Sequence, residues 1–281
     1  MQLRSVDICA VTCVLVPIIV GSAAKALALA GAGLLCCVSI AAWGGETARA
    51  AELKVISAGA VRGVIGNMID DYARATGHTF KFTVGSTGQL REIITSGEPA
   101  DLIIASAPLM TELEKTGRMV PESRVDIGRI GLGVVVREGA AAPDVATPAA
   151  LRQALLDAKS IAYTDPKLGG VSYVHLMKIA DNFGIAEIVT RKGVHASGGN
   201  DAVAKVAQGE AELAIVLISE IHAKGAKLVA PLPEPLQLWT VYSAAIPASS
   251  REPDHARAFI AALTAPAMRE RWTAAGWEPA K

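Results

Sequence analysis

Two apolar stretches near the N-terminus differ from everything that follows them. Residues 8–24 are mostly apolar, and after the charged Lys25 a second apolar run covers residues 26–42. This second run is followed by Gly-Gly and then by Ala-Arg-Ala at residues 48–50, a small-x-small pattern typical of signal-peptide cleavage sites. The pattern predicts a leader over residues 1–50, cleaved at its end, and therefore a mature chain exported to the periplasm.

The upstream run leaves two interpretations open, because a signal peptide ordinarily has a single apolar segment. Residues 8–24 are almost long enough to span a membrane. Either the true start codon lies downstream of Met1, or the first run is a membrane anchor. Cleavage after Ala50 would leave a mature chain without cysteine, because all four cysteines lie in the leader, at positions 9, 13, 36 and 37. Such a chain tolerates an oxidising compartment and has no thiol for a disulfide, a nucleophile or a metal site.

Beyond residue 50, short apolar runs alternate with segments of helical periodicity. The runs that predict strands are residues 53–56, 80–84, 101–105, 131–137, 160–163 and 213–217. Between them, apolar residues recur at spacings of three and four, which predicts helices. These helices begin near residues 61, 90, 151, 171 and 203, and a last one covers residues 256–273. Strands separated by helices of this length predict βαβ crossovers and parallel sheets covered on both faces.

Composition excludes some function classes. The 281 residues include 27 Lys and Arg against 27 Asp and Glu, so the formal net charge is zero, and aromatic residues make up only 4%. A neutral chain without a run of basic residues lacks the electrostatic footprint of a nucleic-acid-binding protein. The part after the leader is long enough for a full hydrophobic core and for a division into two lobes.

The sequence carries none of the common catalytic signatures. It contains no Gly-x-Ser-x-Gly elbow, no phosphate-binding loop ending in Gly-Lys-Ser/Thr and no His-Glu-x-x-His pair. Its five histidines are scattered singly, with no two at ligand spacing on one predicted helix. The sequence therefore predicts no catalytic residue, no metal site and no cofactor.

Five loops of small residues stand between a predicted strand and a predicted helix. They occupy residues 57–60, 85–88, 106–108, 169–172 and 197–200. Glycine and alanine let a ligand approach the backbone, and the first N–H groups of a helix lack intrahelical partners. The helix dipole favours an anion there, and such loops gather at the carboxyl ends of strands, where open α/β sheets bind ligands. Each loop alone is compatible with an ordinary helix cap, but their recurrence in both halves predicts a shared anion-binding cleft.

Three segments carry most of a family resemblance. They are Gly-Ser-Thr-Gly-Gln-Leu at residues 85–90, Gly-Glu-Pro-Ala-Asp-Leu at residues 97–102 and Gly-Glu-Ala-Glu-Leu-Ala-Ile-Val at residues 209–216. In this order they resemble the periplasmic molybdate-binding proteins, which are type-2 periplasmic solute-binding proteins. The resemblance covers essentially all of residues 51–281.

The resemblance implies an α/β fold of two lobes, each a mainly parallel sheet flanked by helices. A small anion is then held in the cleft between the lobes, which close by hinge motion. Lobe 1 is expected at residues 51–134, lobe 2 at residues 135–243, and the return to lobe 1 at residues 244–281. The family also implies an ABC transporter permease as partner and a monomeric state.

Two side-chain donors of the family's pocket are missing from this sequence. By resemblance, a serine hydroxyl of the first loop falls on Ala60 and a pocket tyrosine falls on Leu217, neither of which has a hydroxyl. The hydroxyl of the second loop is kept by Thr87, with Ser86 beside it. Each hydrogen bond lost to a buried charged group costs about 1.5–3 kcal/mol of binding free energy. The resemblance to the family therefore predicts the fold of this chain better than it predicts the ligand.

The other residues expected to bind the ligand lie in the same loops or directly after them. The resemblance places backbone donors near Val171 and Gly199. The further candidates are Ser57, Gly59, Arg62, Gln89, Ser106, Ser172, Tyr173 and Asn200. Among them, Arg62 is the residue type that pairs a carboxylate in a bidentate way.

Three functions stay open. The first is a transport receptor for a molybdate-like oxyanion, a carboxylate or another small anion. The second is an isomerase, since some proteins that resemble this family act on unsaturated tricarboxylates such as aconitate. That chemistry needs a general base, and the aspartates at positions 101, 165 and 201 all fit structural or capping roles. The third is a sensory module that presents its ligand state to a partner, which a membrane anchor at residues 8–24 would favour.

Overall fold

The computed structural model describes residues 50–280 of the chain. The predicted leader, with the choice between a misplaced start and a membrane anchor, lies outside these residues. Ala50–Lys281 form one compact unit. Within the described range, no helix combines the length and the apolar character needed to cross a membrane.

The first of two sheets has six strands in the order β11-β4-β10-β3-β1-β2. Its strands are β1 (Glu52–Ala58), β2 (Thr79–Gly85), β3 (Leu102–Ser106), β4 (Val125–Ile130), β10 (Thr240–Ala245) and β11 (Trp277–Glu278). Strand β1 pairs in parallel with β2 and β3, whereas β10 runs antiparallel to β3 and β4. We call this sheet with its helices lobe 1.

The second sheet has five strands in the order β7-β6-β8-β5-β9. Its strands are β5 (Leu132–Arg137), β6 (Ile161–Thr164), β7 (Gly193–Ala196), β8 (Leu213–Leu217) and β9 (Ala226–Pro231). Strand β6 pairs in parallel with β7 and β8, and β5 runs antiparallel to β8 and β9. We call this sheet with its helices lobe 2.

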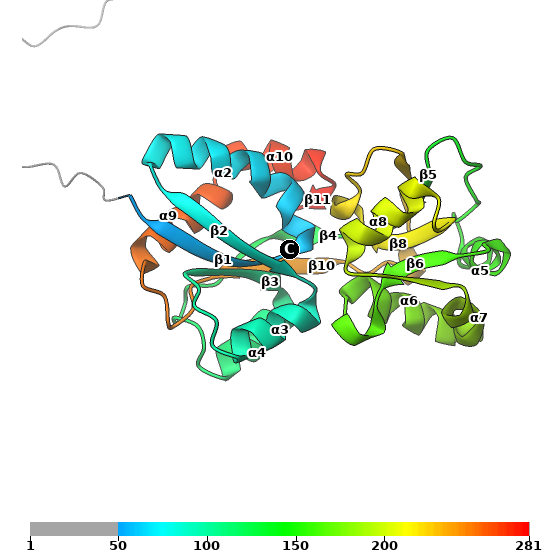
Figure 1. Cartoon of the computed structure of the whole chain (residues 1–281), viewed down its shortest axis with the longest axis horizontal. Helices are drawn as coiled ribbons and strands as arrows, with labels where there is room; N and C mark the ends of the chain where they lie inside the picture. Colours follow the sequence, from blue (N-terminus) through cyan, green and yellow to red (C-terminus); the bar gives the residue numbers. More distant parts are fainter. Residues whose placement is uncertain (1–49, 281) are drawn as a thin grey trace, which may run out of the picture. The chain divides into compact units, whose positions relative to one another are not determined.

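Helices cover both sheets, as Figure 1 shows. Those of lobe 1 are α2 (Arg62–Thr76), α3 (Thr87–Thr95), α4 (Ala107–Lys115), α9 (Pro253–Leu263) and α10 (Arg269–Ala274). Those of lobe 2 are α5 (Pro148–Asp157), α6 (Val171–Asn182), α7 (Ala186–Arg191) and α8 (Gly199–Gln208). The predicted α/β architecture is therefore confirmed, with one sheet in each lobe.

Two details of the prediction are wrong. The sheets are mixed rather than mainly parallel, because the strands that join the lobes, β5 and β10, insert antiparallel to their neighbours. The helix predicted over residues 256–273 is two helices, since α9 ends at Leu263 and α10 begins at Arg269. Pro266 begins the short 3-10 helix η5 (Pro266–Met268) between them, and proline has no N–H to continue an α-helical ladder.

The chain crosses between the lobes twice, from β4 to β5 and from β9 to β10. Gln237 ties the two crossings together. Its Oε1 accepts a hydrogen bond from the Leu132 N–H at 2.8 Å, and its Nε2 donates to the Leu132 carbonyl at 3.0 Å. The expected lobe boundaries, 134/135 and 243/244, fall inside β5 and β10, each of which pairs within one sheet only. That the lobes move as separate bodies stays a prediction.

The innermost strands are the ones whose sequences are continuously apolar. Every residue of β3 and of β8 is buried, as expected from the apolar runs at residues 101–105 and 213–217. Such strands are covered on both faces, so alternation of polar and apolar residues is absent from them.

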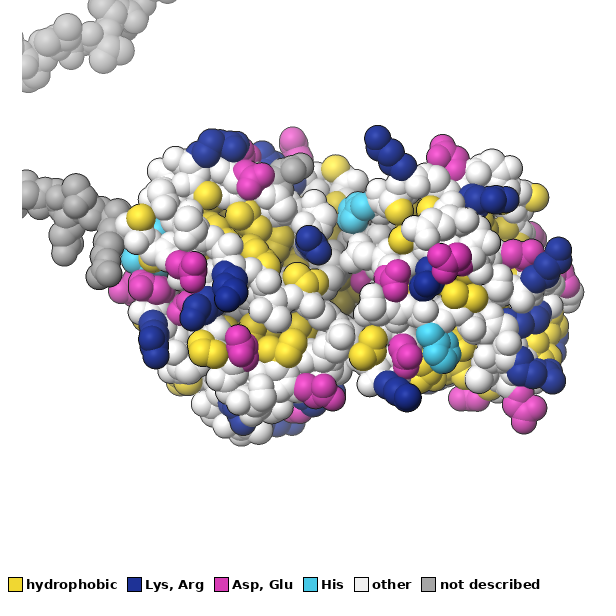
Figure 2. Space-filling model, in the orientation of Figure 1, with side chains coloured by type: hydrophobic (Ala, Val, Ile, Leu, Met, Phe, Trp, Pro, Cys, Tyr) yellow, Lys and Arg dark blue, Asp and Glu magenta, His cyan; other side chains and the backbone are white. Residues whose placement is uncertain are grey.

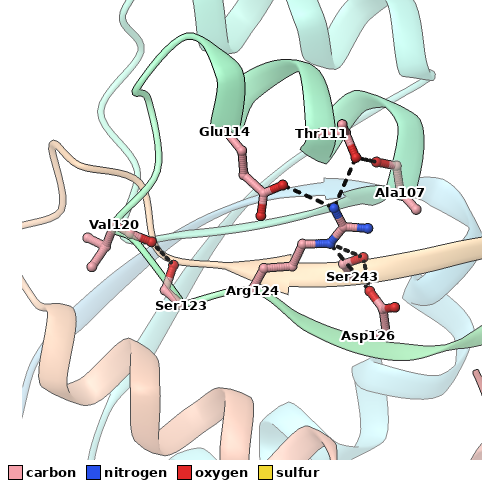
Figure 3. Close-up of polar contacts among 8 residues, drawn as sticks. All are labelled: Ala107, Thr111, Glu114, Val120, Ser123, Arg124, Asp126 and Ser243. Atoms are coloured by element: carbon pink, nitrogen blue, oxygen red, sulfur yellow. Dashed lines mark hydrogen bonds and ion pairs between the residues drawn. The ribbon is translucent and has the colours of Figure 1, made fainter.

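A half-buried arginine connects three elements of lobe 1 (Figure 3). Arg124, just before β4, places Nη1 at 3.1 Å from both Glu114 Oε2 and Thr111 Oγ1 on α4. Its Nε donates to Ser243 Oγ on β10 at 3.1 Å, and that hydroxyl donates to Asp126 on β4 at 2.5 Å. The network holds the returning strand β10 against the strand and helix that precede the crossing.

Candidate site between the two lobes

A cavity of about 340 Å³ lies between the lobes, where strands of both sheets end. Its lining comes from the loops that follow β1, β2, β6, β7 and β8, with one residue from β10. The carboxyl ends of these strands meet at one place, which is where open α/β sheets bind ligands. A larger hollow of about 740 Å³ lies along α5 and β5, away from these strand ends.

Most of the residues predicted from the sequence line this cavity. They are Gly59, Ala60, Arg62, Ser86, Thr87, Gln89, Val171, Ser172, Gly199, Asn200 and Leu217. Residues that no sequence argument singled out for the ligand also line it, and they include Thr164, Asp201, Glu220 and Tyr242. The structure thus brings together four of the five small-residue loops.

The fifth loop and two further candidates lie elsewhere. Ser106 is buried at the end of β3, where it is paired with Tyr242. Ser57 is buried within β1 and donates its hydroxyl to the Ala58 carbonyl at 3.2 Å. Tyr173 packs its ring on Tyr163, with 5.3 Å between the ring centroids, and does not line the cavity.

Two helix N-termini of lobe 2 border the cavity. Helices α6 and α8 begin at Val171 and Gly199, and neither has a side chain that caps its first N–H groups. These groups have no intrahelical partner and carry the positive end of the helix dipole. An anion in the cavity is the partner that such groups favour.

The N-terminus of α3 is arranged differently, because side chains cap it. Ser86 Oγ accepts a hydrogen bond from the Gln89 N–H at 3.4 Å, and Gln89 Oε1 accepts one from the Ser86 N–H at 2.8 Å. This reciprocal capping box occupies two side chains that were expected to bind the ligand. The Thr87 hydroxyl, in contrast, has no hydrogen-bond partner within residues 50–280 and stays available at the cavity wall.

The two lobes touch beside the cavity. The Gly88 N–H donates to the Gly169 carbonyl across the cleft at 3.3 Å, and Ser86 Oγ donates to the Leu168 carbonyl. A Cβ atom on Gly88 would lie 2.5 Å from the Leu168 carbonyl oxygen, so this approach requires glycine. The cavity is therefore closed along this side by direct contact of α3 with the loop after β6.

Glu220 is one of the lining residues that sequence reasoning missed, and it carries a buried carboxyl. It ends the short 3-10 helix η3 (Ile218–Glu220) directly after β8, and its carboxyl is buried at the cavity wall. Oε2 accepts one hydrogen bond, from the Leu217 N–H at 3.2 Å. A Cβ atom on Gly199 would lie 1.9 Å from this oxygen, so the carboxyl lies directly against the first residue of α8.

The carboxyl of Glu220 has an unusual protonation equilibrium. Burial disfavours its charged form and raises its pKa to about 7, although the Leu217 N–H acts in the opposite direction. Burial also raises the pKa of the Tyr242 phenol, and the charge of Glu220 adds to that shift. Its position in the sequence could have indicated Glu220 as a site residue. It is an acidic residue that closely follows the fully apolar strand β8, at the edge of the sheet where ligands bind.

The charged side chains that line the cavity are Arg62, Asp201 and Glu220. Asp201 accepts hydrogen bonds from the N–H and the hydroxyl of Ser197, at 2.8 and 3.1 Å, and Arg62 is exposed. Within the described residues, no group of His, Cys, Asp and Glu could hold a metal ion. On the face shown in Figure 2, basic and acidic side chains are interspersed rather than gathered by sign.

Comparisons with known proteins agree with this geometry. Residues 53–278 match the family described as bacterial extracellular solute-binding protein. An aconitate isomerase of a Pseudomonas species is 31% identical over 218 residues, covering 74% of this chain and 80% of that protein. The molybdate-binding protein ModA of Azotobacter vinelandii is 27% identical over 203 residues, covering 69% of this chain and 72% of that protein.

Solved structures show the same two-lobed fold. The periplasmic molybdate-binding protein of Azotobacter vinelandii matches with a TM-score of 0.69 and 23% identity, over 82% of this chain and 100% of its own. The sulfate-binding protein SubI of Mycobacterium tuberculosis matches with a TM-score of 0.66 and 17% identity, over 82% of this chain and 88% of its own. At these identities the structures establish the architecture of periplasmic binding proteins and leave the ligand open.

Proposed function

Since this chain belongs to the bacterial extracellular solute-binding protein family, we propose that it is the periplasmic receptor of an ABC transporter and captures a small carboxylate anion between its lobes. The observation that carries the proposal is the pair of helix N-termini, α6 and α8, whose uncapped first turns line the cavity. A monomer that hands its ligand to a permease is the form expected of this family.

Two features favour a carboxylate over molybdate. Ala60 and Leu217 line the cavity without offering a hydroxyl. Each lost hydrogen bond weakens the binding of a buried oxyanion by about 1.5–3 kcal/mol. Arg62 lines the same cavity and has the planar fork that suits a carboxylate.

The proposal is tested by thermal unfolding of residues 51–281 with molybdate, tungstate, sulfate, phosphate, citrate and both aconitate isomers. A ligand at 100 times its Kd stabilises the folded protein by about 2.7 kcal/mol. We expect carboxylates to raise the Tm and molybdate to raise it less. If none of these anions raises the Tm, the proposal is wrong.

A matched pair of variants locates the site. Thr87→Ala removes the free hydroxyl at the cavity wall and should weaken carboxylate binding roughly tenfold, as for one hydrogen bond to a charged group. Thr95→Ala, at the other end of α3, removes a hydroxyl that bonds only to the helix carbonyls of Arg91 and Glu92. It should leave the Kd unchanged. Equal affinities of both variants and the wild type would place the ligand elsewhere.

A second candidate function is isomerisation of an unsaturated tricarboxylate. The relative that is 31% identical is an aconitate isomerase, and such a reaction moves a proton between carbon atoms. Glu220 supports this candidate, because its pKa of about 7 suits a group that accepts and returns a proton near neutral pH. Incubation of residues 51–281 with trans-aconitate, followed by chromatography for cis-aconitate, tests it. Turnover that Glu220→Gln abolishes would support the candidate, and absence of turnover excludes it.

A further inference from the structure

The carboxyl of Glu220 has no cationic partner within the described residues. It forms no ion pair with a described residue, and its one hydrogen bond comes from the Leu217 N–H at 3.2 Å. A buried carboxylate normally carries a partner, because an isolated buried charge is costly. Glu220 therefore has accepting and donating capacity that the protein itself does not use.

Among the described residues, no cationic side chain faces Glu220, although the positive end of the α8 dipole lies beside it. Gly199 of α8 contributes backbone, and Tyr242 of β10 contributes a phenol whose pKa the charge of Glu220 raises further. Elsewhere on the wall, Asp201 is negative and engaged with Ser197, and Arg62 is the positive side chain. With Glu220 ionised, the charged side chains of the wall sum to a negative charge.

An anion beside an ionised Glu220 would meet a like charge at low dielectric, which disfavours binding. Protonation removes that charge and turns Glu220 into a donor. We propose that binding of the ligand is coupled to protonation of Glu220, whose carboxyl donates its proton to a carboxylate oxygen of the ligand.

The ligand class follows from the same geometry, and the inference rests on the proposed function of the cleft. Two carboxyl groups of similar acidity that share a site hold one proton between them. The O–H···O⁻ hydrogen bond that forms is short and strong. Sulfate holds a proton much less well than a carboxylate does, so it gains less from this hydrogen bond. Burial already raises the pKa of Glu220 to about 7, so little free energy is needed to protonate it near neutral pH.

The test is the pH dependence of Kd for citrate and trans-aconitate, measured from pH 6 to pH 9 on residues 51–281. Both acids are fully ionised over most of this range, so the protein supplies the titrating group. Below pH 7 the Kd should be nearly constant, and above pH 7 it should rise tenfold for each pH unit, since one proton is bound with the ligand. A Kd that is constant from pH 6 to pH 9 overturns the inference while leaving the proposed function intact.

Two variants assign the proton to its residue. Glu220→Gln keeps the shape and a permanent donor, so it should bind carboxylates with a Kd independent of pH and should bind sulfate more tightly than the wild type does. Asp201→Asn neutralises the other carboxyl of the wall and should keep the wild-type slope. The same slope in Glu220→Gln, or its loss in Asp201→Asn, overturns the assignment. Absence of binding at pH 6 for both acids contradicts the proposed function as well.

Discussion

At the scale of single residues, Glu220 has a consequence for stability that needs no ligand. Its pKa is about 7 in the folded protein against an ordinary value of 4.5. The folded state therefore keeps this proton between pH 4.5 and pH 7, where the unfolded state loses it. Stability consequently falls as the pH rises through this interval, and the cost is complete above pH 7.

We expect Glu220→Gln to remove this pH-dependent cost. The stability difference between the variant and the wild type should grow by about 3 kcal/mol from pH 4.5 to pH 8, the free energy of about 2.5 pKa units. Urea unfolding at both pH values measures it. Glu98→Gln, in an exposed turn after α3, is the control, and a similar growth for both variants would contradict the assigned burial of Glu220.

The loops of the site could be predicted from the sequence, because a run of small residues between a strand and a helix is a pattern within a short stretch of the chain. The roles of single side chains could not. Ser86 and Gln89 cap their own helix at the cavity wall, a role that the same residues would show in the sequence as readily as a role in ligand binding. Glu220 comes near Gly199 only through the packing of β8 beside α8, which no local pattern reveals.

At the scale of elements, strand β4 escaped prediction because its sequence has no local pattern typical of a strand. Strand β4 (Val-Asp-Ile-Gly-Arg-Ile) mixes polar residues and glycine, and four of its six residues are exposed or half-buried in no simple alternation. It pairs with β10, more than one hundred residues later in the chain. The continuous apolar strands β3 and β8 were predictable because burial on both faces leaves a local signature.

The polar network of Arg124 links α4, β4 and β10, and we expect it to stabilise the folded protein. Arg124→Ala leaves Ser243 and Asp126 without their shared, half-buried partner and should lower the free energy of unfolding by about 1–3 kcal/mol. Arg91→Ala breaks an exposed pair with Glu112 and should cost less than about 1 kcal/mol. Urea unfolding compares them, and equal effects would mean that the network adds nothing beyond a surface ion pair.

At the scale of the whole molecule, closure of the cleft depends on the contact between α3 and the loop after β6. Gly88→Ala places a Cβ atom 2.5 Å from the Leu168 carbonyl oxygen, so the lobes must separate. We expect at least tenfold weaker carboxylate binding with no loss of stability, since alanine favours a helix more than glycine does. Gly66→Ala in α2 meets nothing within 4 Å and should raise stability by about 0.5–1 kcal/mol with unchanged affinity.

Calorimetry and thermal unfolding of both glycine variants measure these effects. If Gly88→Ala bound carboxylates as tightly as Gly66→Ala, closure along this contact would not be part of binding. If the lobes do close on the ligand, we expect them to hinge at the two crossings tied by Gln237, because these are the connections between the two sheets.

The central claim is that the cleft between the lobes holds a carboxylate anion, and isothermal titration of residues 51–281 at pH 6 tests it most directly. Citrate, trans-aconitate and molybdate are titrated into the wild type and into Thr87→Ala. The account predicts one carboxylate site per chain, weakened in the variant, and weaker binding of molybdate. Molybdate that binds tightly while both carboxylates give no binding heat would contradict it.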